Sequence, residues 1–186
     1  HDFRFGYRGR GTPERLRDYC AAHGLGCDII PAVTLDGRTV SSTYIRTLLA
    51  EGRMDEAARD LGHGHLLSGT VRRGYGRGGR IDMPTANLAF PEGVLVPAFG
   101  VYAAEAEVEG ARYPASVNIG VHPTAGALER PVLEAWIQGD CGDLYGRRVA
   151  VYLYRRIREE RKFPSMQALK EQVLQDTTEI LTYLKE

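Results

Sequence analysis

The chain has 186 residues and a mass of 20.6 kDa, which is room for one ordinary domain or two small ones. A hydrophobic share of 43% can form a buried core, and no run approaches the roughly 18 apolar residues that a membrane-spanning helix needs. Lysine plus arginine and aspartate plus glutamate both number 24, and this zero net charge argues against a protein that mainly coats nucleic acid.

Up to about residue 62 the sequence has the pattern of a helix-rich α/β segment. Thr12 and Pro13 are typical of a helix start, and Gly24 is typical of a helix end. The patterns predict a helix over 13–23, a short buried strand over 28–33, and helices over 43–51 and 54–61. Because the sequence opens at His1 without a methionine, we interpret it as a piece of a longer protein.

After a glycine-rich linker predicted at 62–65, the pattern changes to a period of two residues, with frequent glycine turns. Between residues 104 and 108, alanine or valine alternates with glutamate, which predicts one buried and one solvated face. Strands are expected over 101–109, 113–118, 132–138 and 148–157. So many short antiparallel strands indicate a barrel or a sandwich, of which we favour the barrel. Ser165 then begins a C-terminal helix with one apolar face.

A loop of interleaved glycines and arginines is the first candidate binding element. Its members are Gly74, Gly76, Gly78 and Gly79 with Arg72, Arg73, Arg77 and Arg80. Such a loop can bring backbone N–H groups and guanidinium groups close to a phosphate. It lacks the Gly-Lys-Ser/Thr of a Walker A loop. A flexible hairpin with solvated arginines is an equally good interpretation of the loop alone.

Thr85 and Asn87 follow this loop and are two residues apart in an extended segment. Their hydroxyl and carboxamide therefore lie on one face of the chain, while Ala86 and Leu88 point the other way. Two neutral oxygen ligands beside such a loop suit a magnesium ion that nucleotide phosphates mainly bind. The alternative is that both side chains only close a turn by bonding to the backbone.

Glu134 is the candidate general base. Glu105 and Glu107 belong to a clean alternation and resemble ordinary solvated glutamates, whereas apolar residues flank Glu134 on both faces of its strand. A carboxylate there is expected to be partly withdrawn from water and suited to take a proton from an alcohol. A solvent-facing glutamate on an edge strand is the alternative.

Taken in order, these residues resemble those of riboflavin kinase from about residue 66 to the C-terminus. The segments that carry the resemblance are Gly69-Thr70-Val71, Arg77-Gly78, Pro84-Thr85-Ala86-Asn87, Asn118-Ile119-Gly120, Pro123-Thr124, Glu134, Asp143-Leu144-Tyr145-Gly146, Arg158-Glu159 and Lys162-Phe163. Two departures, Asp82 before the Pro-Thr-Ala-Asn segment and Ala125 after Pro-Thr, affect the expected flavin affinity and rate more than the type of reaction.

The resemblance implies a mainly β fold, a six-stranded antiparallel Greek-key barrel with a C-terminal helix. The implied reaction transfers the γ-phosphoryl group of ATP to the ribityl 5′-hydroxyl of riboflavin and gives FMN. Thr85 and Asn87 would hold Mg²⁺ with ATP, and Glu134 would be the catalytic base. The phosphates would be covered by Gly74, Gly76, Arg77, Gly78 and Arg80. Asn118 and Arg158 would lie on the flavin side.

Two earlier segments carry a second resemblance, namely His1-Asp2-Phe3-Arg4-Phe5-Gly6 and Val40-Ser41-Ser42-Thr43-Tyr44-Ile45-Arg46. They resemble the second half of the FMN adenylyltransferase domain of the bacterial bifunctional riboflavin kinase/FAD synthetase family. The resemblance implies an incomplete nucleotidyltransferase domain over 1–62 and a riboflavin kinase domain over 63–186. Its ATP-phosphate segment would be Ser41, Ser42, Thr43 and Arg46, at a helix start. Since the first half of that domain is absent from the sequence, we expect this chain to make no FAD.

Two other functions stay open at this point. One is a flavin- or nucleotide-binding barrel without turnover, and the other, the least favoured, is an RNA-binding barrel that uses the loop arginines. The expected partners are small molecules, namely ATP and ADP with riboflavin and FMN, and neither nucleic acid nor a membrane is expected. Three cysteines without paired spacing, Cys20, Cys27 and Cys141, indicate a reducing, cytoplasmic setting.

Overall fold

The computed structural model describes residues 2–72, 85–90, 93–121 and 131–185, and it divides the chain into two compact units. The first unit covers His1–Ser41 and the second covers Ser42–Glu186. This division by compactness falls before the helices that precede the barrel. The family resemblance implies a different boundary, between residues 62 and 63, which separates segments by the domain they derive from. This domain boundary stays a prediction.

The first unit holds one helix and one short hairpin. Helix α1 (Pro13–Ala22) begins as expected, because Thr12 Oγ1 accepts a hydrogen bond from the Arg15 N–H at 3.3 Å. A short 3₁₀ turn, η1 (Tyr7–Gly9), precedes it. After Gly24 has turned the chain with a φ of +65°, the Leu25 N–H donates to the Cys20 carbonyl oxygen at 2.8 Å.

The strand expected over 28–33 was a wrong prediction. These residues form no strand, and the chain instead makes a hairpin just after them, from β1 (Thr34–Leu35) and β2 (Arg38–Thr39). Asp36 and Gly37 take positive φ angles of 51° and 75°, which is the turn geometry that a two-residue hairpin requires. The apolar run over 28–33 misled the prediction because a strand needs a partner, and its Ile30 is 75% exposed here.

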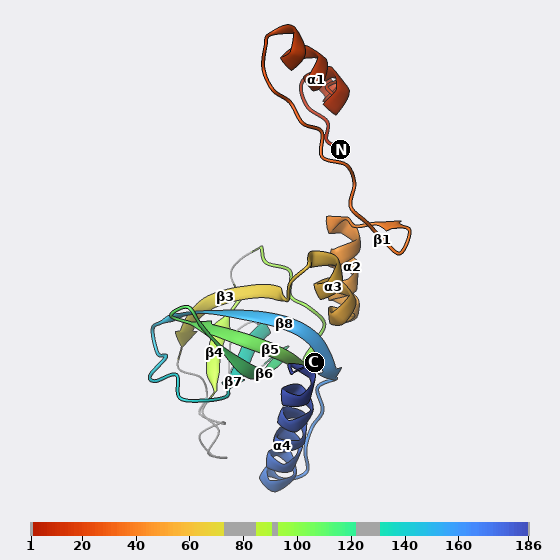
Figure 1. The fold of residues 1–186 in the computed structure, drawn as a ribbon. Helices are drawn as coiled ribbons and strands as arrows, with labels where there is room; N and C mark the ends of the chain where they lie inside the picture. The colour runs from red at the N-terminus through yellow and green to blue at the C-terminus, as the bar shows by residue number, and fades with distance from the viewer. Residues whose placement is uncertain (1, 73–84, 91–92, 122–130, 186) are drawn as a thin grey trace. The chain divides into compact units, whose positions relative to one another are not determined.

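The second unit is a closed barrel with helices packed on it (Figure 1). Its six strands are antiparallel to their neighbours, and their order around the barrel is β3-β4-β7-β6-β5-β8. They are β3 (His65–Arg72), β4 (Ala86–Ala89), β5 (Gly100–Val108), β6 (Ala111–Val121), β7 (Pro131–Ile137) and β8 (Arg148–Arg158). Since β5, β6 and β7 follow one another and β8 returns beside β5, the connection is a Greek key. The predicted mainly β fold, a six-stranded antiparallel Greek-key barrel, is confirmed.

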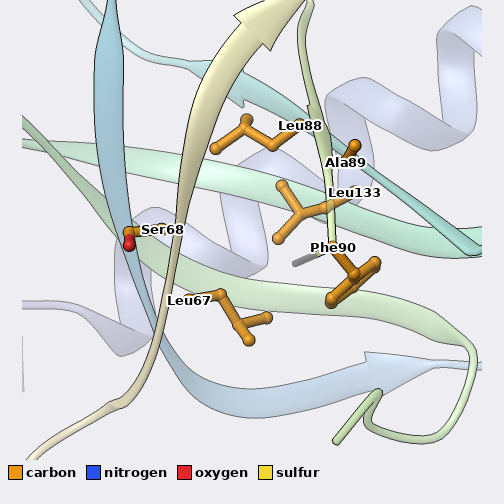
Figure 2. A pocket seen from close by; sticks show the side chains of 6 residues that line it. All are labelled: Leu67, Ser68, Leu88, Ala89, Phe90 and Leu133. Carbon is orange, nitrogen blue, oxygen red and sulfur yellow. The ribbon is translucent and has the colours of Figure 1, made fainter. Parts of the chain in front are cut away.

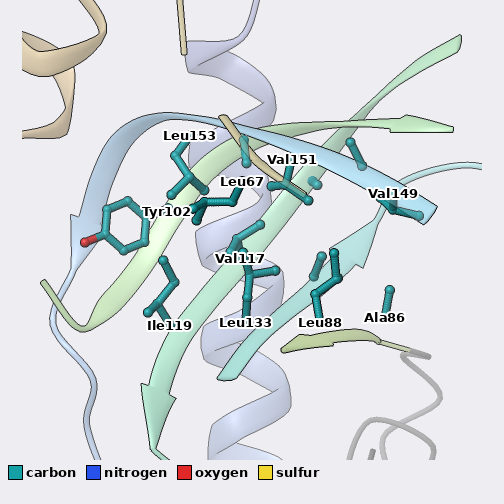
Figure 3. Packing of buried hydrophobic residues seen from close by; sticks show 14 of the residues in the cluster. Leu67, Ala86, Leu88, Tyr102, Val117, Ile119, Leu133, Val149, Val151 and Leu153 are labelled. Carbon is teal, nitrogen blue, oxygen red and sulfur yellow. The ribbon is translucent and has the colours of Figure 1, made fainter. Parts of the chain in front are cut away.

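Alternating residues of the strands fill the barrel, as Figure 3 shows. The alternation expected along β5 is confirmed, because Ala104 and Ala106 are fully buried and the glutamates between and beyond them are not. Tyr102 adds the largest fully buried side chain, and its hydroxyl donates to the carbonyl oxygen of Ala98. Burial raises the pKa of this phenol to about 12, with Arg156 acting in the opposite direction.

Three helices belong to this unit within the described ranges: α2 (Ser42–Glu51), α3 (Met54–Leu61) and α4 (Met166–Tyr183). Helix α3 packs on β8 and β3. It is joined to β3 by the junction at residues 62–65, which the sequence predicts to be a linker. That junction is tight, because a Cβ on Gly64 would lie 2.8 Å from Cε1 of the Tyr154 ring. Helix α4 begins at Ser165, whose Oγ accepts from the Ala168 N–H at 3.1 Å, and it packs on β6 and β5.

Candidate active site

Three candidate residues form one row across three neighbouring strands. Asn87 of β4 is directly opposite Glu134 of β7, and Glu134 is directly opposite Asn118 of β6. Residues that face each other across antiparallel strands point to the same side of the sheet. The residues that alternate with them, such as Leu88 and Leu133, are buried inside the barrel. The row of Asn87, Glu134 and Asn118, called the polar row below, therefore lies on the outer face of the barrel.

Asn87 forms the end of the polar row that was expected to meet the nucleotide. Its Nδ2 donates to the backbone carbonyl oxygen of Thr85 at 3.3 Å. This is the side-chain to backbone bond of the alternative interpretation, but it uses only the nitrogen of the carboxamide. It therefore orients Asn87 with its Oδ1 as the atom that a cation can meet, which suits Mg²⁺. Arg72, the exposed last residue of β3, is directly opposite Asn87 and brings a positive charge to the same end.

The glycine-arginine loop would continue the site from this end of the row. The residues predicted to cover the phosphates, from Gly74 to Arg80, lie outside the described residues, and so do the two departures at Asp82 and Ala125. Their roles stay predictions. The described part of the site begins again at Thr85, which is half-buried and immediately precedes β4.

Glu134 lies in the middle of the polar row, with a carboxamide on the neighbouring strand at each side. It is half-buried on the outer face, between Val132 and Trp136 of its own strand. A carboxylate in this place can accept a proton from a hydroxyl group that is held against the row. Because neighbouring strands lie about 4.8 Å apart, the two asparagines at the ends of the row are separated by about 10 Å at the backbone.

Asn118, at the other end of the row, contacts a residue that the sequence analysis missed. Its Nδ2 donates to Oε1 of Glu160 at 2.9 Å. Glu160 belongs to the segment that connects β8 with α4, and its carboxylate occupies the space where a Cβ on Gly120 would be. A glycine inside a long strand often marks a close approach of another group, and this signal was available in the sequence.

Arg158 is held by a second residue that the sequence analysis missed. Its Nη2 and Nε donate to the Asp176 carboxylate of α4, the shorter bond being 2.7 Å, and its Nη1 donates to the Glu159 carbonyl oxygen at 2.9 Å. Only 3% of the Asp176 side chain is exposed. The guanidinium group thus fastens the end of β8 to α4, and a direct contact with flavin stays a prediction. Asp176 interrupts the apolar face of α4, which is the signal that could have identified it.

The predicted phosphate segment of the adenylyltransferase remnant lies at the start of α2. Ser42 is the first residue of this helix, and Ser41, Thr43 and Arg46 are exposed around it. Backbone N–H groups at a helix start can bind an anion, so the exposed position suits the expected role without testing it.

A small pocket is lined by residues of β3, β4 and β7 and by Phe90, which follows β4 (Figure 2). Its lining is almost entirely apolar, with Ser68 as the polar exception, and it includes Leu88, Leu133 and Phe90. The volume of about 10 Å³ holds about one water molecule and no substrate. This pocket is therefore too small to be the substrate site.

Comparisons with known proteins identify the family of the chain. A family model described as riboflavin kinase matches residues 61–184. Bifunctional riboflavin kinase/FMN adenylyltransferase of Bacillus subtilis is 36% identical over 98% of this chain and 58% of its own length. The Escherichia coli K12 protein of the same name is 35% identical over 94% and 56%. The chain thus spans little more than half the length of these curated relatives.

Two solved structures have a similar fold. One, from Streptococcus pneumoniae and described as a macrolide-efflux protein, is 34% identical with a TM-score of 0.80, over 94% of this chain and 56% of its own. The other, riboflavin kinase from Trypanosoma brucei, is 22% identical with a TM-score of 0.50, over 67% and 82%. None of the helices in the described ranges is long and apolar enough to cross a membrane. From the family model and the curated relatives, the chain belongs to the riboflavin kinase family.

Proposed function

We propose that this chain transfers the γ-phosphoryl group of ATP to the ribityl 5′-hydroxyl of riboflavin, giving FMN and ADP. The observation that carries the proposal is the direct register of Asn87, Glu134 and Asn118 on one outer face of the barrel. A phosphoryl transfer needs a donor site, a group that orients the attacking hydroxyl, and an acceptor site, arranged so that attack and departure are in line. The polar row offers these three places in that order.

In this proposal each end of the row binds one substrate. Thr85 and Asn87 would hold Mg²⁺ with the phosphates of ATP, and a bound ion would supply neutralisation of the charge that develops during transfer. Riboflavin lies at the Asn118 end, with its 5′-hydroxyl against Glu134. As the hydroxyl oxygen bonds to the γ-phosphorus, the bond to the bridging oxygen of ADP breaks, and Glu134 takes the hydroxyl proton.

The test is incubation of the chain with riboflavin, ATP and Mg²⁺, followed by mass spectrometry of the flavin. We expect FMN and ADP in equal amounts and no FMN when EDTA removes the metal. ADP without FMN, or equal activity in EDTA, would contradict the proposal. A barrel that binds flavin without turnover would quench riboflavin fluorescence but form no FMN. This outcome would distinguish a binding protein from a kinase.

For residues 1–62 we propose an origin as the second part of an FMN adenylyltransferase domain. In support, two curated relatives that match nearly the whole chain are named for both activities, and each is much longer than this chain. The first unit also exposes large apolar side chains, with Tyr7, Ile30 and Val33 each more than 60% exposed. Such side chains are typical of a surface that another part of a domain covers.

We therefore expect that these 186 residues make FMN but no FAD. Adenylyl transfer needs a site that positions both ATP and the FMN phosphate, and one half of that domain supplies one wall of it. Incubation with FMN, ATP and Mg²⁺, followed by chromatography, tests this. Formation of FAD and pyrophosphate at a rate comparable to FMN formation would contradict the assignment of residues 1–62.

We place the kinase reaction in the cytoplasm, where ATP is available.

A further inference from the structure

Glu160 contacts the polar row, but the proposed reaction gives it no role. Glu160 lies two residues beyond the end of β8, and Asn118 lies in the middle of the outer face of β6. The 2.9 Å hydrogen bond between them joins the β8–α4 segment to the row next to Glu134. A charged acceptor makes this bond stronger than one between neutral groups.

Gly120 provides the space for this contact. The Gly120 backbone is buried although it lies on the outer face, and a Cβ at this position would overlap the Glu160 carboxylate. The φ angle of Gly120 lies outside the left-handed region, so its backbone conformation is open to any residue. The glycine is therefore needed to leave space for the Glu160 carboxylate, and not to allow a turn.

Two further contacts fix the segment that carries Glu160. On one side the buried Asp176 holds Arg158, and on the other Arg161 donates to the side chain of Gln172 on α4. The ring of Phe163 lies near both guanidinium groups, 5.6 Å from that of Arg158 and 4.9 Å from that of Arg161. The β8–α4 segment, from which Glu160 contacts Asn118, is therefore held in place by α4.

The bond also determines how Asn118 presents its carboxamide. Because Glu160 is an acceptor, it takes the nitrogen of the carboxamide, and the oxygen of Asn118 is left for another group. An oxygen beside Glu134 can accept a hydrogen bond from a substrate donor such as a hydroxyl. If the carboxamide were reversed, its nitrogen would face that donor and would repel it.

We propose that Glu160 is a positioning residue of the acceptor site, which holds Asn118 with its carboxamide oxygen toward the hydroxyl-bearing substrate. This inference rests on the proposed function, because the hydroxyl-bearing substrate is riboflavin there. Glu160 acts through Asn118 and takes no part in proton transfer. Its loss should weaken binding of the acceptor and spare both ATP and the chemical step.

The experiment compares Glu160→Ala, Gly120→Ala and the double variant with the parent chain. Glu160→Ala removes the carboxylate, and Gly120→Ala displaces it while leaving every polar group in place. The control is Glu159→Ala, since the Glu159 side chain is 84% exposed and its ion pair among the described residues is with Arg156, at 3.8 Å. Glu160→Gln keeps an acceptor oxygen and should rescue the parent behaviour. Circular dichroism and the melting temperature verify that each variant folds.

Each single variant should raise the Kd for riboflavin, measured by quenching of flavin fluorescence, about five- to tenfold, which is the usual net worth of one intramolecular hydrogen bond. The KM for riboflavin should rise by the same factor as the Kd, while the KM for ATP and the kcat should stay within about twofold of the parent values. Because both substitutions remove the same contact, the double variant should be no worse than either single one.

An unchanged riboflavin affinity in Glu160→Ala, an equal rise for ATP, or additive losses in the double variant would overturn the inference. Failure of the proposed function looks different, because the parent itself would then form no FMN. If Gly120→Ala does not fold, Glu160→Ala against Glu159→Ala decides the matter alone.

Discussion

The barrel carries two polar patches on its outer surface, and both are built by residues in direct register across the strands. The polar row sets Glu134 between two asparagines on the strands at its sides. The second patch, called the tyrosine face below, consists of Glu105, Glu107, Arg112, Tyr152 and Tyr154 on β5, β6 and β8. Here Glu107 is directly opposite Arg112, and Glu105 is directly opposite Tyr152.

The carboxylates of the tyrosine face are held by charged and phenolic donors. Glu105 Oε2 accepts from the Tyr154 hydroxyl at 2.7 Å and from Arg112 Nη1 at 3.1 Å. Glu107 accepts from the Tyr152 hydroxyl at 3.2 Å, and the Arg112 guanidinium lies 4.1 Å from the centre of the Tyr152 ring. Such a network fixes the strands together. In the polar row, by contrast, the residues directly opposite the glutamate on both neighbouring strands are asparagines. The difference lies in the neighbours that the register supplies.

The largest expected effect separates the glutamates of the two patches. Glu134→Gln keeps the size of the side chain but cannot take a proton, so kcat for FMN formation should fall about 10²- to 10⁴-fold. Binding of riboflavin and of ATP should persist. Glu105→Gln is the matched control and should keep near-parent kcat, as steady-state kinetics on both variants will show. If Glu105→Gln loses turnover and Glu134→Gln does not, the base has been assigned to the wrong patch.

A smaller effect is expected on stability, and it concerns the tyrosine face. Glu105→Gln weakens an ion pair in which the Glu105 side chain is 29% and the Arg112 side chain 46% exposed. Partly exposed pairs contribute little, so the free energy of unfolding should fall by no more than about 1 kcal/mol. Urea unfolding of Glu105→Gln and the parent measures this. A loss several times larger would mean that the network carries much of the stability of the barrel.

The last expected effect is the alkaline pH dependence of the free energy of unfolding. Burial, and then the bond to Glu105, raise the pKa of Tyr154 from 10.0 to about 12, and burial raises that of Tyr102 to about 12. Both phenols therefore bind their proton more tightly in the folded chain. Their contribution to the free energy of unfolding should be fully present below pH 10 and should be lost as the pH rises from 10 to 12.

Urea unfolding of the parent at about pH 9 and about pH 11 checks this decrease. Tyr154→Phe and Tyr102→Phe should each show a smaller decrease than the parent, because each lacks one of the two titrating phenols. Equal stability of the parent at both pH values would argue against the environment assigned to both tyrosines.

Much of the barrel follows from the sequence because its strands have a simple period. The buried residues alternate as predicted over 104–108 of β5 and over 149–153 of β8, and the apolar positions identify the inner face. The strand expected over 28–33 fails for the opposite reason, since an apolar run does not specify a partner strand. The hairpin over 34–39 depends instead on the turn residues Asp36 and Gly37.

The site is harder to predict because its parts come together only across strands. Thr85, Asn87 and Glu134 could be selected from local patterns, but the opposition of Glu134 to both asparagines depends on the strand order of the barrel. Glu160 lies in a loop without periodicity, and its partner is 42 positions away in the sequence. Only the glycine inside β6 marks its place in advance.

The central claim is that the polar row binds the phosphoryl donor at one end and the acceptor at the other. The most direct test measures both substrates on both ends by isothermal titration calorimetry, with Asn87→Ala and Asn118→Ala. We expect Asn87→Ala to weaken Mg²⁺-ATP binding and to spare riboflavin, and Asn118→Ala to weaken riboflavin binding and to spare Mg²⁺-ATP. If either variant weakens both substrates equally, or if the losses are exchanged between the two ends, the order donor, base, acceptor along the row is wrong.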